Sequence, residues 1–130
     1  EDTNAFNKII DGFRMPKDTD LEKKIRLDAI EDATKYATEI PFKVMETSFK
    51  SMEVMQAMLQ DGLKNSLSDA GVGVLCARAA VIGAYFNVRI NAKDIKDRDF
   101  ATAILSKAAI IYEKTIAMEQ ETISYIDSQM

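Results

Sequence analysis

The side chains suited to acid–base or binding chemistry fall in three short segments of this sequence. The first is the run Asp2–Phe6, where the periodicity of apolar residues indicates that a helix begins. A carboxylate at a helix start either caps the helix or, because the positive helix end favours its ionised form, serves as a general base. The residues by themselves leave both roles open for Asp2.

The second segment is Asn65-Ser66-Leu67-Ser68-Asp69, which leads into a glycine-containing helix. Ser68 and Asp69 are good helix-capping residues, so the segment reads as a loop with a cap. The same polar groups at a helix N-terminus also suit an anionic or amide-bearing ligand. Asn65, Ser68 and Asp69 are therefore candidate binding residues, with capping as the alternative.

The third segment is Gly83–Asn91, near the end of a strongly apolar helix, and it contains two asparagines, Asn87 and Asn91. Residues four apart on a helix project to the same side, so the two amides lie on one face. Buried amides need hydrogen-bond partners. Those partners are either backbone groups of a neighbouring helix or the hydrogen-bonding edge of a bound ligand.

The sequence has no histidine and one cysteine, Cys76. This composition excludes Ser-His-Asp and Cys-His catalysis and histidine-ligated metal sites. With no zinc-ligand spacing and no phosphate-binding loop, we expect neither a metal nor a cofactor. One cysteine allows no internal disulfide, which fits a reducing, cytoplasmic compartment. Cys76 stands among apolar residues and is expected in the core.

The bulk properties favour one domain over residues 1–130. The hydrophobic fraction of 47% is ordinary for a folded domain, and the formal net charge of −4 argues against nucleic-acid binding. Residues 71–88 are nearly all apolar but include Arg78. A span needs about 20 apolar residues, and a central charge is costly, so we expect a central bundle helix and no membrane partner.

Only two prolines and five glycines occur, and apolar residues recur at helical spacing. We predict an all-α fold, an antiparallel multi-helix bundle of about five helices. Thr19 and Glu22 form a capping box, Asp97 caps the last helix, and Pro41 should kink or break its helix. The expected helices run from Thr3 to about Phe13, from Thr19 to Ile40, from Pro41 to about Gln60, from Ser68 to about Ile90, and from Asp97 onward.

The last helix is apolar on more than one face around residues 104–112. A helix that is apolar on several sides is buried on several sides. Because about five helices cannot cover all these surfaces, we infer a partner chain or a further segment, and expect a homodimer or a higher homo-oligomer.

The three segments resemble the cyclodeaminase domain of formiminotransferase-cyclodeaminase and its stand-alone bacterial relatives, some of which are called methenyltetrahydrofolate cyclohydrolases. Order and spacing agree over nearly the whole chain, and the segment 83–91 is the most specific. The matching residues are Asp2 with Ala5-Phe6, Pro16-Lys17, Ile40-Pro41, Asn65-Ser66-Leu67-Ser68-Asp69, Gly83-Ala84-Tyr85-Phe86-Asn87-Val88-Arg89-Ile90-Asn91, Asp94-Ile95 and Asp97.

The resemblance implies an all-helical, dimeric enzyme that binds a tetrahydrofolate derivative as its substrate and uses no metal. It places Asp2 at the position of the catalytic aspartate. The other matched polar residues become ligands of the folate, with Lys17 or the Lys23-Lys24-Arg26 cluster opposite its glutamate tail. The expected activity is formiminotetrahydrofolate cyclodeaminase, or alternatively methenyltetrahydrofolate cyclohydrolase.

One departure from the family pattern concerns the beginning of the sequence. Family members start with a further helical segment that contains a glycine-rich loop of the Gly-Gly-Gly-Ser type, and the match here begins almost at Glu1. We therefore expect that the first part of the usual domain is missing. This departure favours the alternative of a non-catalytic helical-bundle assembly module.

Overall fold

The structure, a computed structural model, describes residues 1–62 and 64–130. It confirms the all-α prediction, and within the described residues it contains no strand. The described residues form four α-helices, where about five were expected. In chain order the elements are α1 (Asp2–Phe13), α2 (Asp20–Asp61), the short 3-10 helix η1 (Lys64–Ser66), α3 (Leu67–Ala92) and α4 (Arg98–Gln129).

Helix α2 accounts for the difference in helix number. It runs for 42 residues through Pro41, which makes it about 63 Å long at 1.5 Å per residue. The prediction that a new helix starts at Pro41 was wrong. Ile40 and Pro41 are both buried, so packing against the neighbouring helices offsets the local cost of the proline.

A repeat of seven residues organises the core of α2, α3 and α4. Such a repeat keeps one seam of each helix against its neighbours along their whole length, as in coiled coils. The sequence conceals it because many apolar residues lie outside the seams. Its buried members are Thr38, Met45, Met52 and Leu59 on α2, Val74, Val81 and Val88 on α3, and Ala101, Ala108, Thr115 and Thr122 on α4.

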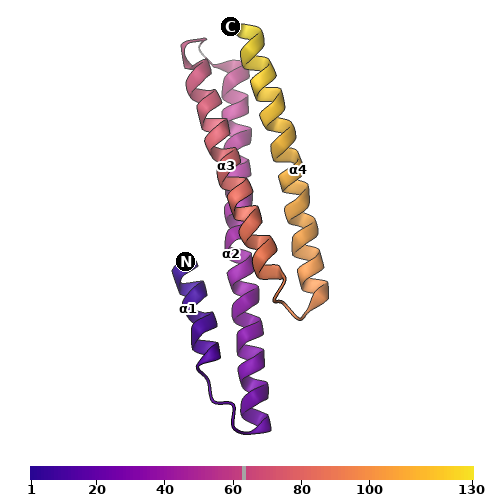
Figure 1. Ribbon diagram of the computed structural model, residues 1–130. Coiled ribbons are helices and arrows are strands. Elements are labelled where there is room, and N and C mark those ends of the chain that lie inside the picture. The colour runs from indigo at the N-terminus through magenta and orange to yellow at the C-terminus, as the bar shows by residue number, and fades with distance from the viewer. Residues whose placement is uncertain (63) are drawn as a thin grey trace.

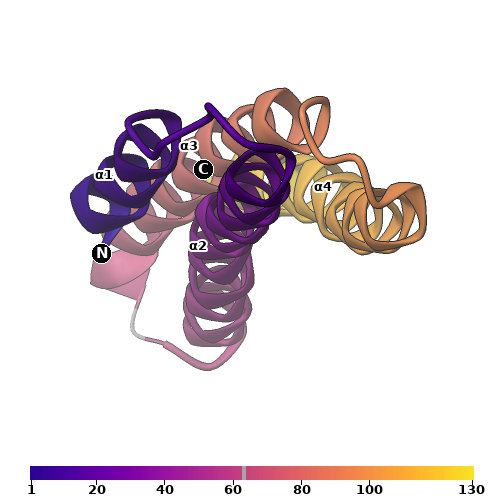
Figure 2. The same cartoon turned by 90° about the horizontal axis from the view of Figure 1, so that it is seen from below.

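The helices share α2 as their common support. Helix α1 packs along the N-terminal half of α2, and α3 packs antiparallel to the C-terminal half of α2. Helices α1 and α4 lie on opposite sides of the α2–α3 pair (Figures 1 and 2). A Cβ atom at Gly12 would lie 3.0 Å from Ile30 Cγ1, so glycine permits the close approach of α1 to α2. The start of α1 and the end of α3 therefore meet near the middle of α2.

Two of the three predicted helix caps are present in the structure. The Thr19–Glu22 capping box is present, and the Asp97 side chain accepts a hydrogen bond from the Phe100 N–H, so both predictions are confirmed. The predicted cap at Ser68 and Asp69 was wrong. Helix α3 begins at Leu67, and its N-cap residue makes no side-chain capping bond. At its other end α3 extends to Ala92, beyond the boundary expected from the sequence.

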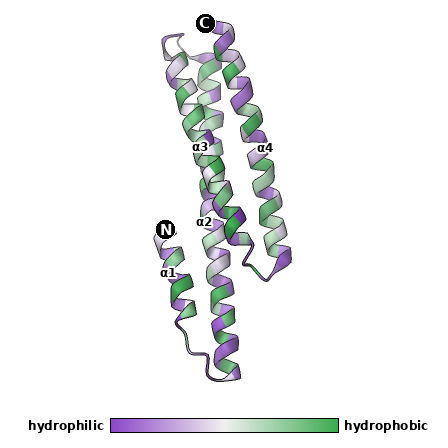
Figure 3. Cartoon of the chain, viewed as in Figure 1, coloured by the Kyte–Doolittle hydropathy of each residue, from purple (hydrophilic) through white to green (hydrophobic). Residues whose placement is uncertain are grey.

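Helix α3 is covered on one face only. Its seam is buried, but Val72, Phe86 and Ile90 on the other face are 57–61% exposed, and green marks its hydrophobic residues in Figure 3. Cys76 is exposed on this helix, so its expected place in the core was wrong. Helix α3 was expected to be a central bundle helix, and it is buried along its seam alone.

A single stretch in the described part of the chain, Lys64–Ala92, is long and apolar enough to cross a membrane. Its most apolar window has a mean hydropathy of 1.5, and 33% of that window is buried. The core helix of a water-soluble protein passes the same test, so length and composition give weak support to a span.

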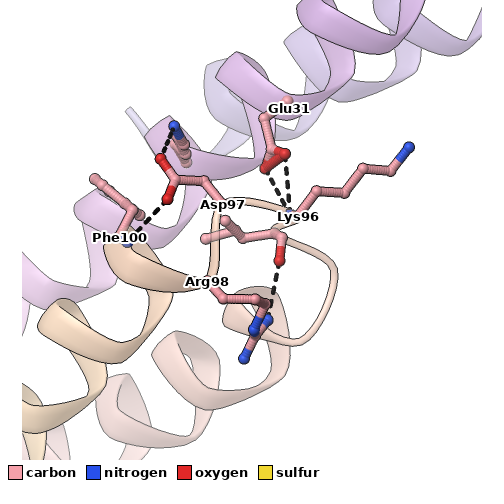
Figure 4. A network of polar contacts seen from close by, with 7 residues as sticks. Glu31, Lys96, Asp97, Arg98 and Phe100 are labelled. Carbon is pink, nitrogen blue, oxygen red and sulfur yellow. Dashed lines mark hydrogen bonds and ion pairs between the residues drawn. The ribbon is translucent and has the colours of Figure 1, made fainter.

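The turn between α3 and α4 is tied back to α2 (Figure 4). The backbone N–H of Lys96 donates to both carboxylate oxygens of Glu31, at 2.9 and 3.0 Å. Lys35 Nζ donates to Asp97 Oδ2 at 2.9 Å. Arg98 donates to the Ile95 carbonyl at 2.9 Å and closes the turn itself. These bonds fix the end of α3 relative to α2.

The Asp97 carboxylate makes the stability of the fold depend on pH through this turn. The Lys35 ammonium, followed by the Phe100 N–H, lowers the pKa of Asp97 below its usual range. A lowered carboxyl pKa stabilises the fold above the ordinary carboxyl value near 4, and the contribution is lost as the pH falls through the lowered pKa.

We predict that Asp97→Ala lowers the urea midpoint of unfolding at pH 7, and that this loss shrinks as the pH falls below about 4. Asp97→Asn keeps a good capping side chain and removes the charge, so its loss at pH 7 should be smaller. Urea titrations of the three proteins at a series of pH values provide the measurement. A loss that does not change with pH would contradict the ion-pair contribution.

Candidate functional site

A pocket of about 250 Å³ lies where α1, α2 and α3 meet. It brings together Asp2, from the first predicted segment, and Asn87 and Asn91, from the third. The helices position these groups because the start of α1 and the end of α3 reach the same part of α2. Its complete lining is Asp2, Phe6 and Ile9 of α1, Ala37 of α2, and Asn87 and Asn91 of α3.

Asp2 is the first residue of α1, and its side chain is exposed. The N-cap position belongs to Glu1, and this helix end has no side-chain capping bond. The capping role considered for Asp2 is therefore not seen. Asp2 therefore offers the pocket a carboxylate that is not engaged in capping.

The two asparagines of α3 have different surroundings. Asn91 is half-buried, and its Nδ2 donates to the Ala37 carbonyl at 3.0 Å. This contact realises one alternative drawn from the sequence, a backbone partner on a neighbouring helix. Asn87 is exposed, and its side chain makes no hydrogen bond to any described residue. Its amide is therefore free to donate to, and accept from, a molecule in the pocket.

The second predicted segment lies at the opposite end of α3. Asn65 belongs to η1, while Ser68 and Asp69 lie in the first turn of α3, and all three are exposed. Asn87 follows Ser68 by 19 residues, which is about 29 Å along a helix. One copy of the chain does not unite these residues with Asp2, so their part in the same site stays a prediction that needs a second copy.

The basic residues expected near a glutamate tail lie beyond the far end of α1. Lys17 is exposed in the turn between α1 and α2, beyond the end of α1, whose 12 residues span about 18 Å from the Asp2 end. Arg26 Nε donates to the Phe13 carbonyl at 3.4 Å, and its guanidinium lies over the Phe13 ring. Within this chain Arg26 thus helps to secure the end of α1.

A larger groove, with a volume of about 410 Å³, lies between α1 and α2 and was not predicted from the sequence. Lys8 Nζ lies 4.1 Å from the centre of the Tyr36 ring across this groove. Lys8 and Asp11 are three residues apart, and Asp32 and Tyr36 are four apart, so each pair lies on one helix face. This spacing is the feature of the sequence from which the groove could have been predicted. None of the predicted site residues lines it. The lining residues are Lys8, Asp11, Gly12, Met15, Ala29, Asp32, Ala33 and Tyr36.

The acid–base chemistry open to the smaller pocket follows from its side chains. Within residues 1–62 and 64–130, no group of three or more histidine, cysteine, aspartate or glutamate side chains is placed to hold a metal ion. The pocket instead combines one carboxylate with two amides. A carboxylate accepts and returns a proton, and amides hold a ligand by paired donors and acceptors.

Comparison with known proteins gives consistent matches. Methenyltetrahydrofolate cyclohydrolase of Methylorubrum extorquens is 31% identical over 130 residues, which is 100% of this chain and 62% of that protein. Formimidoyltransferase-cyclodeaminase of Gallus gallus is 35% identical over 101 residues, 78% of this chain and 19% of that protein. The chain thus spans less than two thirds of the length of these relatives.

The fold has a counterpart among solved structures. The crystal structure of formiminotetrahydrofolate cyclodeaminase from Thermotoga maritima aligns with a TM-score of 0.73 and 21% identity, covering 98% of this chain and 58% of that chain. The sequence pattern of the family described as formiminotransferase-cyclodeaminase matches residues 1–110. Since that match covers most of the 130 residues, this chain belongs to the formiminotransferase-cyclodeaminase family.

Proposed function

We propose that the protein carrying this chain is a formiminotetrahydrofolate cyclodeaminase, which converts 5-formiminotetrahydrofolate to 5,10-methenyltetrahydrofolate and ammonia. The observation that supports this proposal is the pocket in which Asp2 lies beside Asn87 and Asn91. Family membership supplies the substrate class, a derivative of folate.

The proposed reaction needs one group that moves a proton between two nitrogens. The formimino group reacts in its protonated, amidinium form: N10 of the substrate attacks the one-carbon unit held on N5, a five-membered ring closes, and the bond from that carbon to the leaving nitrogen breaks. The Asp2 carboxylate accepts the proton lost by N10 and returns it to the leaving nitrogen, which departs as ammonia. A pocket that holds N10 in contact with the one-carbon unit also speeds ring closure, because the reacting atoms are already in position.

The size of the pocket suits part of the substrate. Pockets for drug-sized ligands measure about 300–1,000 Å³, so about 250 Å³ accommodates the reacting rings but not the whole folate. Amide side chains match the donors and acceptors along the pterin edge. We assign the glutamate tail to the positively charged side chains beyond α1, Lys17 and the Lys23-Lys24-Arg26 cluster.

A second activity has its own supporting observation. The Methylorubrum extorquens protein named methenyltetrahydrofolate cyclohydrolase aligns with this chain over its full 130 residues. In that reaction the same carboxylate would activate water against the methenyl carbon. Assays with 5-formiminotetrahydrofolate and with 5,10-methenyltetrahydrofolate, which follow ammonia release and methenyl absorbance, distinguish the two activities. Inactivity of the protein carrying this chain toward both would favour a non-catalytic assembly module.

We predict that the protein is a homodimer or a higher homo-oligomer, because the outer face of α3 is apolar and uncovered in one chain. Phe86, which is 57% exposed there, should lie in the contact. Sedimentation equilibrium at micromolar concentration should give a mass above that of one chain, and Phe86→Glu should shift it toward the monomer. A wild-type monomer would refute the assembly.

We predict that Asn87→Ala raises KM for the folate up to roughly 10-fold, the value of one lost hydrogen bond, with little change in kcat. Asn87 lines the pocket and is exposed, so the melting temperature should stay close to that of the wild type. Steady-state kinetics and a thermal melt provide the measurement. The matched control is Asn7→Ala, an exposed amide of α1 outside this pocket. An unchanged KM would remove Asn87 from the binding surface.

The central prediction concerns Asp2→Asn in the protein that carries this chain. Loss of the proton acceptor should lower kcat by roughly 10²–10⁴-fold, the contribution of a positioned acid–base group. Stability should change by no more than about 1 kcal/mol, because the side chain is exposed and makes no capping hydrogen bond. Formation of methenyltetrahydrofolate by absorbance and a thermal melt measure both effects.

Asp20→Asn is the matched control for this variant, because Asp20 is also an exposed aspartate in the first turn of a helix but lies outside the pocket. It should keep normal turnover. If Asp2→Asn is folded and turns over like the wild type, Asp2 is not the acid–base group, and Asp69 becomes the next carboxylate to test.

A further inference from the structure

Pro41 leaves one carbonyl of α2 without its usual partner. In a regular α-helix the N–H of residue 41 would donate to the carbonyl of Ala37, four residues earlier. Proline has no N–H, and its ring also crowds that carbonyl. Ala37 is buried, and a buried carbonyl without a donor costs free energy. The continuity of α2 therefore depends on a donor from outside the helix.

The structure supplies that donor from α3. Asn91 Nδ2 lies 3.0 Å from the Ala37 carbonyl oxygen and donates to it. The backbone of Asn91 is held in place, since its carbonyl accepts the N–H of Asp94 at 3.2 Å in the turn that ends α3. Ala37 and Asn91 both line the pocket that contains Asp2.

We infer that Asn91 is a positioning residue whose side-chain amide replaces the N–H missing at Pro41, and so locks α3 to α2 at the wall of the pocket. The same bond fixes the amide itself: with Nδ2 engaged by Ala37, Asn91 turns Oδ1 away from that carbonyl. The unengaged oxygen is an acceptor, so Asn91 would favour a ligand group that donates a hydrogen. The hydrogen-bonding claim does not depend on the proposed function, while the claim about the ligand rests on it.

A double-mutant cycle between Asn91 and Pro41 tests the lock. With alanine at position 41, a backbone N–H is available to the Ala37 carbonyl, and the amide is no longer required. Asn91→Ala should raise the unfolding equilibrium constant roughly 10-fold in the Pro41 background, as for an acceptor left without its donor. In the Pro41→Ala background the rise should be less than about 3-fold.

The matched control is Asn87→Ala, which removes an amide one turn earlier in the same pocket without touching the Ala37 carbonyl. It should show no coupling to Pro41→Ala. Equal effects of Asn91→Ala in both backgrounds would overturn the inference, because a residue that serves only as a ligand has no reason to couple to Pro41. If Pro41→Ala does not fold, proton exchange of the Asn91 side-chain amide in the wild type gives the answer: slow exchange supports the lock, and exchange as fast as that of Asn87 refutes it.

The catalytic assay separates this inference from the proposed function. If Asn91 positions the pocket, Pro41→Ala should restore part of the turnover that Asn91→Ala loses. If the protein proves inactive on folates, the stability cycle still decides whether the lock exists. A KM defect that persists in the double variant, with no coupling in stability, would assign Asn91 to the ligand alone.

Discussion

The continuity of α2 is the constraint on which the rest of this structure depends. One 42-residue helix supports α1 on its first half and α3 and α4 on its second half. If the helix broke at Pro41, the two halves would no longer have a fixed relation, and the pocket at their junction would have no defined shape. Burial of the proline and an external donor for the Ala37 carbonyl are what keep it continuous.

The pocket forms at this junction because two helix ends arrive there from opposite directions. Asp2 begins α1, and Asn87 and Asn91 lie in the last turns of α3. Helix ends suit polar chemistry, since the start of a helix favours a carboxylate and leaves backbone groups unpaired. The long seams of buried residues farther along α2, α3 and α4 provide rigidity but hold no comparable set of reactive groups.

The outer face of α3 is apolar and is left uncovered within one chain. Its seam toward α2 and α4 is closed, yet Val72, Phe86 and Ile90 on the other side are largely exposed. The chain spans 62% of its Methylorubrum extorquens relative and 58% of its Thermotoga maritima structural counterpart. Helix α3 holds the second predicted segment, Asn65–Asp69, far from Asp2 within one chain. A site that unites the two therefore stays a prediction that needs a second copy.

The sequence by itself determined the helical class, the Thr19 and Asp97 caps and the family, because these depend on local periodicity, capping chemistry and motif spacing. It also identified Asp2, Asn87 and Asn91 as residues of interest. Tertiary structure decided what local rules misjudged: Pro41 lies inside a helix because packing and Asn91 offset its cost, and Cys76 is exposed because its face of α3 lacks a neighbour in this chain. Only the packing of α1 and α3 against α2 showed which predicted groups meet, since sequence spacing cannot tell which helix ends come together.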